Sequence, residues 1–252
     1  MTKVIAIANQ KGGVGKTTTA INLATAMAAI DKKILLVDAD PQGNASTGLG
    51  ILESQRTPCL YNLLTNQNFN KQSIKETKIP NLHIIASTKD LAASEIELVD
   101  VDQRENVLRG VLEKITEYDF IFIDCPPALG LLTINSLVAA NSVIIPLQCE
   151  FFALEGLSAL INTIETIRSG LNSNIELEGV VLTMFDKRNS LSSLVEEDVR
   201  GHFKNKVYNT VIPRNVRVSE APSHGKPVLL YDTTCIGSQA YIGLAKEVIF
   251  NQ

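Results

Sequence analysis

The segment from residue 4 to residue 30 places a glycine-rich loop between an apolar run and an amphipathic stretch. Residues 4–8 read VIAIA, residues 9–18 read NQKGGVGKTT, and the amphipathic stretch ends near Ile30. This order predicts a strand, a phosphate-binding loop and a helix, because glycines let backbone N–H groups turn inward around phosphate oxygens at the positive end of a helix. A coincidental glycine-rich turn is the alternative. The strand-to-helix context favours a nucleoside triphosphate site.

The side chains of the loop suit different parts of such a nucleotide. Lys16 can reach the β- and γ-phosphates, and the Thr17 hydroxyl can ligate Mg²⁺. The ordinary motif has a glycine five residues before Gly15, but this chain has Gln10 there, followed by a second lysine. That lysine points either to solvent or to a second nucleotide bound by a facing subunit. The predicted nucleotide-binding residues of the loop are Lys11, Gly12, Gly13, Val14, Gly15, Lys16, Thr17 and Thr18.

Acidic residues follow two further apolar runs. Asp38 comes after residues 34–37 (ILLV), with Asp40 two positions later, and Asp124 comes after residues 120–123 (FIFI). A buried carboxylate at the end of a strand needs a partner, and Mg²⁺ held through a water is a natural one. Asp38 and Asp40 face the same side if strand geometry persists through Asp40, so that one supports the metal and the other the attacking water. The alternatives are a helix cap for Asp124 and a turn-starting Asp-Pro for Asp40.

The remaining pattern predicts an alternation of strands and helices. Apolar runs at 4–8, 34–37, 82–86, 120–123, 142–147 and 179–184 predict strands, and helical periodicity is clearest at 18–30, 102–117, 131–140, 153–170 and 237–250. We expect a single α/β domain over residues 1–252, with a mostly parallel twisted sheet and helices on both faces. Residues 55–80 are more polar and are expected to form short helices and loops over one edge. The ligand should bind at the carboxyl ends of the strands.

Composition excludes several classes of protein. No apolar run approaches the roughly 18–20 residues of a membrane span, and no signal peptide is expected before the first strand. We therefore expect a cytosolic protein. The cysteines, at positions 59, 125, 149 and 235, form no C-x-x-C pair, which argues against a zinc site, a redox motif and an iron–sulfur carrier.

Basic residues are distributed unevenly, although the net charge is −4. Residues 201–217 hold four cations and no acid, and three more cations lie just before them. Several cations on one face can bind DNA phosphates without reading the base sequence. A normally solvated surface is the alternative. The cations are Lys187, Arg188, Arg200, Lys204, Lys206, Arg214 and Arg217.

The glycine-rich loop resembles the deviant Walker A motif of the ParA/MinD family of dimeric ATPases. Residues 38–44 (DADPQGN) resemble that family's switch I, and residues 120–127 (FIFIDCPP) resemble its Walker B strand and switch II. Residues 212–217 and 219–225 are similar to a stretch typical of the chromosomal ParA subgroup, often called Soj. The matches run from residue 3 to about residue 248. The resemblance implies a P-loop NTPase fold, with ATP and Mg²⁺ as cofactors and ATP hydrolysis as the activity.

The resemblance also implies roles for single residues. Asp40 should hold the attacking water, and Lys11 should reach the phosphates of the partner subunit's ATP, so the predicted catalytic residues are Lys11, Asp40 and Lys16. The predicted metal residues are Thr17, Asp38 and Asp124. Pro213 and Asn215 are expected to line the adenine. Because Arg188 matches a DNA-binding arginine of Soj-type proteins, the predicted DNA-binding residues are Arg188, Arg214 and Arg217.

The implied function is chromosome or plasmid partitioning. ATP closes a sandwich homodimer, the dimer binds non-specific double-stranded DNA, and a ParB-type protein triggers hydrolysis and release, which places the protein in the cytoplasm on the nucleoid. The alternative is a membrane-cycling positioning ATPase like MinD, whose subgroup carries a C-terminal amphipathic basic helix. Residues 244–252 resemble a core helix with one lysine, which favours DNA over membrane. A plasmid ParA that represses its own promoter would need an N-terminal DNA-binding domain, and we expect no space for one before Lys3.

Overall fold

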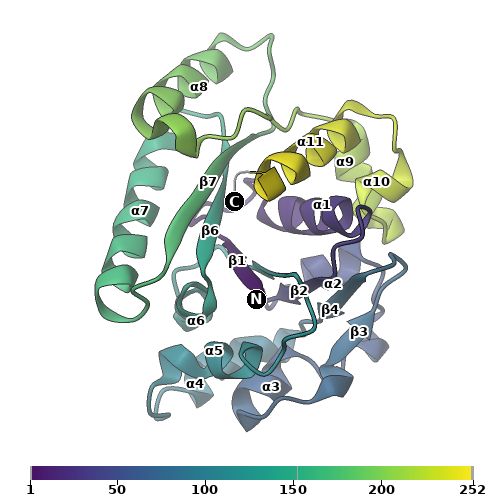
Figure 1. The fold of residues 1–252 in the computed structure, drawn as a ribbon, viewed down its shortest axis with the longest axis vertical. Helices are drawn as coiled ribbons and strands as arrows, with labels where there is room; N and C mark the ends of the chain where they lie inside the picture. Colours follow the sequence, from purple (N-terminus) through teal and green to yellow (C-terminus); the bar gives the residue numbers. More distant parts are fainter. Residues whose placement is uncertain (1, 152, 251–252) are drawn as a thin grey trace.

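A computed structural model describes residues 2–151 and 153–250 (Figure 1). Its centre is a seven-stranded sheet in the order β3-β4-β2-β5-β1-β6-β7. Neighbouring strands are parallel, except that β3 runs antiparallel to β4 at the edge. The strands are β1 (Lys3–Ile7), β2 (Ile34–Asp38), β3 (Ile74–Glu76), β4 (Leu82–Ile85), β5 (Phe120–Asp124), β6 (Ser142–Gln148) and β7 (Glu176–Thr183).

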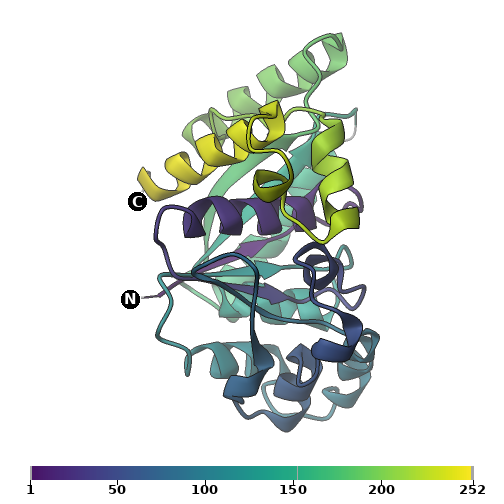
Figure 2. The ribbon, with the colours of Figure 1, turned by 90° about the vertical axis from the view of Figure 1, so that its right-hand side faces the viewer.

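Helices cover both faces of the sheet, as Figure 2 shows from the side. Helices α1 and α11 lie together over one face, and α3, α5, α6 and α7 lie over the other. The helices are α1 (Lys16–Ala28), α2 (Asn44–Gly48), α3 (Leu60–Asn66), α4 (Ser94–Glu97), α5 (Val107–Leu112), α6 (Leu131–Ala139), α7 (Ala153–Gly170), α8 (Ser190–Phe203), α9 (Val216–Glu220), α10 (Val228–Tyr231) and α11 (Ile236–Phe250). The predicted fold, a mostly parallel α/β sheet covered on both faces, is confirmed.

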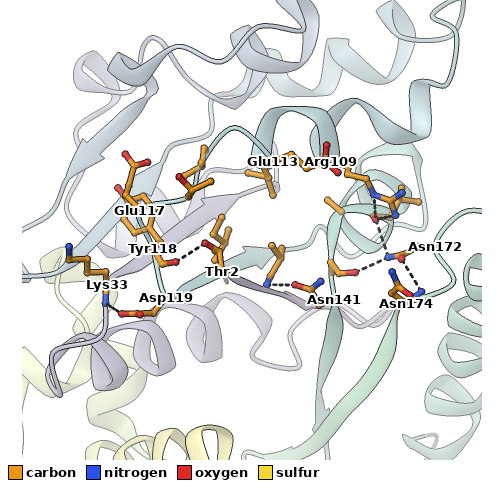
Figure 3. A pocket seen from close by; sticks show the side chains of 18 of the residues that line it. Thr2, Lys33, Arg109, Glu113, Glu117, Tyr118, Asp119, Asn141, Asn172 and Asn174 are labelled. Carbon is orange, nitrogen blue, oxygen red and sulfur yellow. Dashed lines mark hydrogen bonds between the residues drawn. The ribbon is translucent and has the colours of Figure 1, made fainter. Parts of the chain in front are cut away.

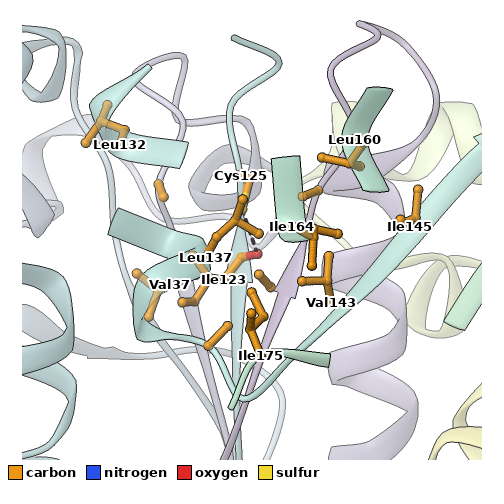
Figure 4. Close-up of a cluster of buried hydrophobic side chains, with 14 of the residues drawn as sticks. Val37, Ile123, Cys125, Leu132, Leu137, Val143, Ile145, Leu160, Ile164 and Ile175 are labelled. Atoms are coloured by element: carbon orange, nitrogen blue, oxygen red, sulfur yellow. Dashed lines mark hydrogen bonds between the residues drawn. The ribbon is translucent and has the colours of Figure 1, made fainter. Parts of the chain in front are cut away.

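Each central strand contributes alternate side chains to two separate cores, because successive residues of a strand point to opposite faces. In β2, Leu35 and Val37 belong to the cluster under α6 and α7, whereas Ile34 and Leu36 belong to the cluster under α1 and α11. Figure 4 shows the first cluster, where Val37 and Ile123 lie near side chains of α6 and α7. Burial on both faces explains why these strands read as continuous apolar runs.

The six predicted strands are confirmed, and the differences lie at the edges of the fold. Residues 55–80 do contain a short helix, but they also form β3, which was not predicted. The helix predicted over 102–117 is wrong in length: α5 spans Val107–Leu112, preceded by a 3₁₀ turn that begins after Gln103 at φ +54°. Helix α8 was missed, although Asn189 caps it by accepting a hydrogen bond from the Leu191 N–H.

The sheet register brings three functional segments to one edge. Ile7 of β1 and Asp38 of β2 are both paired with Asp124 of β5, so the glycine-rich loop and both acidic turns begin side by side. At the other end of the chain, α11 buries Tyr241, Leu244 and other residues against α1. This confirms the predicted core helix as far as Phe250, and residues 251 and 252 of the predicted segment lie outside the described residues. No helix in the described part of the chain is long and apolar enough to cross a membrane.

Candidate functional site

The loop between β1 and α1 forms an open cradle at the carboxyl end of the sheet. Gly13 and Gly15 have φ values of +74° and +89°, a region that L-residues with side chains seldom occupy. A Cβ atom added at Gly12 or Gly13 would meet no atom within 4 Å. The loop therefore faces open space, as a phosphate-binding loop must. Helix α1 begins at Lys16, so its N-terminal N–H groups face the same space.

Lys16 points into this loop from the first turn of α1. Its ammonium is part of a side chain that is only 7% exposed and donates to the Lys11 carbonyl oxygen at 3.1 Å. Burial lowers the pKa of Lys16, whereas negative charge on Asp124 and Asp40 opposes the shift. Thr17 and Thr18 follow in the same turn. A buried ammonium beside the glycine-rich loop and the N-terminus of α1 suits the phosphates of a nucleotide.

Strands β6 and β7 both support the loop from behind. The Thr183 hydroxyl donates to the Val14 carbonyl oxygen at 2.8 Å, and the Asn9 amide donates to the Pro146 carbonyl oxygen at 2.7 Å. Neither support was predicted from the sequence, because each hydrogen bond joins residues more than 130 positions apart.

Asp38 and Asp124 are fully buried on neighbouring strands. One oxygen of Asp38 accepts hydrogen bonds from the backbone N–H and the hydroxyl of Ser46, at 2.8 and 2.7 Å. The other oxygen of Asp38 and both oxygens of Asp124 lack a hydrogen-bond partner of normal geometry, although the Thr17 hydroxyl lies close enough to favour the ionised form of Asp124. Three unpartnered oxygens in the interior are costly for a chain that binds nothing there.

The raised pKa values of Asp38 and Asp124 show that their ionised forms are disfavoured in this environment. Burial raises the pKa of Asp38 to about 6, although the hydrogen bonds from Ser46 oppose this shift. Burial and then the neighbouring charge of Asp38 raise the pKa of Asp124 well above its ordinary value. A divalent cation would reverse both effects, because it favours the ionised carboxylates. Within residues 2–151 and 153–250, no three acidic, histidine or cysteine side chains form a complete metal site, so Mg²⁺ here would need oxygens from Thr17, nucleotide or water as well.

Asp40 lies just beyond β2, in the turn that leads to α2. The strand ends at Asp38, so the condition that strand geometry extends to Asp40 is not met. One Asp40 carboxylate oxygen accepts the Gln42 N–H at 2.9 Å, and the Asp40 carbonyl accepts the Gly43 N–H at 2.9 Å. The turn that was predicted to begin at Asp40 is therefore present. Asp40 nevertheless lies near enough to Asp38 and Asp124 to influence both.

Lys11 is exposed at the outer rim of the loop. Its ammonium forms an ion pair with Glu150, and the Glu150 carboxylate also accepts a hydrogen bond from the Gln148 amide. The two charged side chains are 47% and 44% exposed. Glu150 was not predicted from the sequence, and no local pattern marks it.

Residues 212–215 run beside the end of β7, at the same edge as the glycine-rich loop. Pro213 forms a bridge with Phe185, and the Arg214 N–H donates to the Phe185 carbonyl oxygen at 3.1 Å. Asn215 caps α9 by accepting the Val218 N–H at 3.3 Å. Pro213 and Asn215 therefore lie at the edge of the sheet that carries the glycine-rich loop, and the side-chain amide oxygen of Asn215 already accepts a hydrogen bond as a helix cap.

The three arginines of the predicted DNA-binding set lie on neighbouring segments but are not equally available. Arg188 forms a two-pronged ion pair with Asp186, at 3.0 and 2.9 Å, and this pairing lowers the pKa of Asp186 to about 2. Arg217 pairs with Glu220 at 3.1 Å and lies 3.5 Å from Asp232. Among the described residues, Arg214 has no ion pair within bonding distance. The cluster thus carries less unpaired charge than the sequence suggests.

Comparison with known proteins decides the family. A family model described as an AAA domain matches residues 2–177. The chromosome partitioning protein ParA of Caulobacter vibrioides is 58% identical over 250 residues, which cover 98% of this chain and 94% of that protein. The sporulation initiation inhibitor protein Soj of Bacillus subtilis is 54% identical over 252 residues, and the alignment covers 100% of this chain and 100% of that protein. The chain belongs to the ParA/Soj family. The resemblance drawn from the sequence motifs is confirmed.

A solved structure supports the same placement. Cobyrinic acid a,c-diamide synthase from Mycobacterium smegmatis, crystallised with an ATP analogue and magnesium, is 32% identical with a TM-score of 0.86. The alignment covers 99% of this ParA/Soj-family chain and 95% of that protein.

A cavity of about 810 Å³ lies away from the family's nucleotide edge, near the amino ends of β1 and β5 (Figure 3). Its polar groups are largely used within the chain. The Asn172 amide donates to three backbone carbonyl oxygens, Arg109 donates to the Val138 carbonyl oxygen, and the Thr2 hydroxyl donates to the Tyr118 carbonyl oxygen. None of the predicted site residues lines this cavity.

Proposed function

We propose that this chain is an ATPase of chromosome or plasmid partitioning that converts ATP and water into ADP and phosphate. The observation that carries the proposal is the set of three buried carboxylate oxygens on Asp38 and Asp124 that lack a hydrogen bond of normal geometry, beside a glycine-rich loop that is followed directly by Lys16. Magnesium ATP supplies both missing partners, a cation for the carboxylates and phosphates for Lys16. The names of the relatives from Caulobacter vibrioides and Bacillus subtilis support this assignment.

The side chains divide the work of hydrolysis as follows. The loop N–H groups and Lys16 bind the phosphates, and Thr17 with the carboxylates of Asp38 and Asp124 holds Mg²⁺ directly or through water. When bound, the metal neutralises phosphate charge. Asp40 orients a water in line with the terminal phosphate, and positioning of this kind supplies most of the catalysis in phosphoryl transfer.

Dimerisation completes the site in this proposal. Two chains close face to face around ATP, and Lys11 of each chain reaches the nucleotide of the other. Lys11 must then leave Glu150. That separation is cheap, because an ion pair exposed on both sides contributes only about 0–1 kcal/mol. A charge placed in this way on the developing transition state can accelerate phosphoryl transfer by roughly 10³-fold or more.

The dimer is proposed to bind non-specific double-stranded DNA through Arg188, Arg214 and Arg217 of both chains. DNA phosphates would compete with Asp186, Glu220 and Asp232 for these arginines. One chain offers too little unpaired charge, and two chains offer twice as much, so ATP controls binding. We further propose that a ParB-type protein stimulates hydrolysis, that the protein acts in the cytoplasm on the nucleoid, and that residues 1–252 form one domain.

The test is hydrolysis of ATP by the purified full chain. Phosphate release should require Mg²⁺ and should be lost in Lys16→Ala. Turnover that persists in Lys16→Ala, or that is unaffected by chelation of Mg²⁺, would contradict the proposed activity.

A further inference from the structure

Arg56 lies behind the segment that carries Asp40. It follows a 3₁₀ turn (Glu53–Gln55), and its side chain is buried, with 9% of its surface exposed. Its guanidinium donates to three acceptors: the Thr47 hydroxyl at 2.7 Å, the Ile51 carbonyl oxygen at 3.3 Å and the Ser87 carbonyl oxygen at 3.2 Å. Thr47 and Ile51 belong to the segment after β2, and Ser87 follows β4.

The charge of Arg56 is not neutralised by an adjacent acid. Within the described ranges of the chain, no carboxylate forms an ion pair with it. Burial of a cation among neutral acceptors costs free energy that a well-packed apolar side chain would not. A contribution to folding stability therefore does not explain why an arginine lies at position 56. Its contacts indicate a second role.

The guanidinium packs directly against Gly43. A Cβ atom at Gly43 would lie 2.4 Å from the Arg56 Nη1 atom, and the glycine has a φ of +64°. Gly43 closes the Asp40 turn, because its N–H donates to the Asp40 carbonyl oxygen. Its own carbonyl oxygen accepts a hydrogen bond from the Thr47 hydroxyl at 3.0 Å. Arg56 thus contacts both ends of the short stretch from Gly43 to Thr47.

The same contacts extend to Asp38. Ser46, which donates twice to Asp38, lies between Gly43 and Thr47. The Ser46 hydroxyl oxygen also accepts the Ser87 N–H at 3.0 Å, while the carbonyl oxygen of Ser87 accepts from Arg56. One guanidinium therefore contacts both the residues that hold the Asp38 carboxylate, through Ser87 and Ser46, and the backbone turn that carries Asp40, through Gly43.

We propose that Arg56 is a positioning residue for ATP hydrolysis, which fixes residues 43–51 so that Asp40 holds its water in line. The inference rests on the proposed function. Lysine cannot replace arginine here, because a single ammonium lacks the planar set of donors that spans three acceptors. Displacement of Asp40 by a fraction of an ångström lowers turnover, whereas the glycine-rich loop, which binds the phosphates, keeps its own supports.

The experiment compares the wild-type full chain with Arg56→Lys and with Arg109→Lys as a matched control. Arg109 also binds a backbone carbonyl, that of Val138, but lies on the cavity away from the nucleotide edge. Each protein is assayed for its melting temperature, its affinity for magnesium ATP, kcat, and hydrogen exchange at the amides of residues 43–51. For Arg56→Lys we expect kcat to fall by about 10- to 100-fold, ATP affinity to stay within about twofold, and exchange to accelerate in residues 43–51. Arg109→Lys should keep wild-type kcat and exchange in that segment.

The outcomes separate the inference from the function on which it rests. If the wild-type chain does not hydrolyse ATP, the proposed function fails, and hydrogen exchange still shows whether Arg56 holds residues 43–51. If the wild-type chain is active and Arg56→Lys retains its kcat, the inference is overturned. A loss of kcat that matches the fraction of unfolded protein, or equal acceleration of exchange throughout the chain, would also overturn it in favour of a purely structural role.

Discussion

Lys11 and Glu150 form an ion pair between the glycine-rich loop and the turn after β6. The two residues are 139 positions apart. The ion pair keeps Lys11 in contact with its own chain, whereas Lys11 is proposed to act across a dimer interface. A contact of this kind favours the separated subunit, because Lys11 cannot serve Glu150 and a partner's nucleotide together.

Release of this pair should favour dimerisation. Glu150→Gln is expected to raise the dimer fraction at subsaturating ATP, by no more than about 25-fold in the dimerisation constant, because each dimer releases two exposed ion pairs that contribute at most about 1 kcal/mol each. Sedimentation across an ATP series measures the change. Glu165→Gln is the control, since it breaks a similarly exposed ion pair with Arg168 on α7. Weaker dimerisation in Glu150→Gln would show that Glu150 serves the dimer itself.

The two loop lysines should fail in different ways. Lys11→Ala is expected to bind ATP but neither dimerise nor hydrolyse it, because its ammonium lies at the exposed rim. Lys16→Ala should lose nucleotide affinity, because its buried ammonium faces the phosphate loop. Titration with a fluorescent ATP analogue separates the two variants. Equal nucleotide affinity of Lys16→Ala and the wild-type chain would refute this division.

Asp40→Ala should separate assembly from turnover. Only the positioning of water is removed, so ATP binding and dimerisation are expected to persist while phosphate release is abolished. Gel filtration with ATP should show a lasting dimer. A monomer in that experiment, or normal hydrolysis, would contradict the role of Asp40.

Asp124→Asn should stabilise the nucleotide-free chain while weakening magnesium ATP binding. A raised folded-state pKa means that ionisation of Asp124 costs folding free energy, and this cost sets in as the pH rises above the unfolded value of 3.8. The gain in melting temperature should therefore be small near pH 4 and larger at pH 7–8. Thermal unfolding with and without magnesium ATP tests both effects. If magnesium ATP raises the melting temperature of the variant as much as that of the wild-type chain, Asp124 does not help to bind the metal.

Charge reversal of two arginines should abolish DNA binding. Arg188→Glu with Arg217→Glu is expected to lower the affinity for random duplex DNA by at least about tenfold and to reduce the salt slope by roughly one per lost phosphate contact. ATP-dependent dimerisation should remain. Binding measured with ATP over a salt series tests this expectation.

Arg104→Glu with Arg168→Glu is the matched control for that experiment, because it makes the same change in net charge at two ion-paired arginines outside the cluster. The control should bind DNA nearly as well as the wild-type chain. DNA binding that selects a base sequence, ignores ATP or survives the Arg188 and Arg217 substitutions would refute the DNA-binding mechanism.

The amino-acid sequence by itself determined the six parallel strands, the helices α1, α6, α7 and α11, the glycine-rich loop and the acidic ends of β2 and β5. These features depend on local periodicity and on residue types within a few positions, so they can be read before the chain is folded. Edge features were harder to predict. Strand β3 and the short α5 depend on what lies beside them, and their apolar patterns are too brief to identify.

Tertiary structure alone decided how the site residues meet. The parallel register places Asp38 beside Asp124, and folding brings Glu150 to Lys11 and Arg56 behind Gly43. It also brings Asp232 within 3.5 Å of Arg217, whereas the Arg188–Asp186 and Arg217–Glu220 pairs join residues close in the sequence. The physical reason is that hydrogen bonds and ion pairs require a few ångströms of separation, and separation in space between distant segments follows from packing rather than from local sequence.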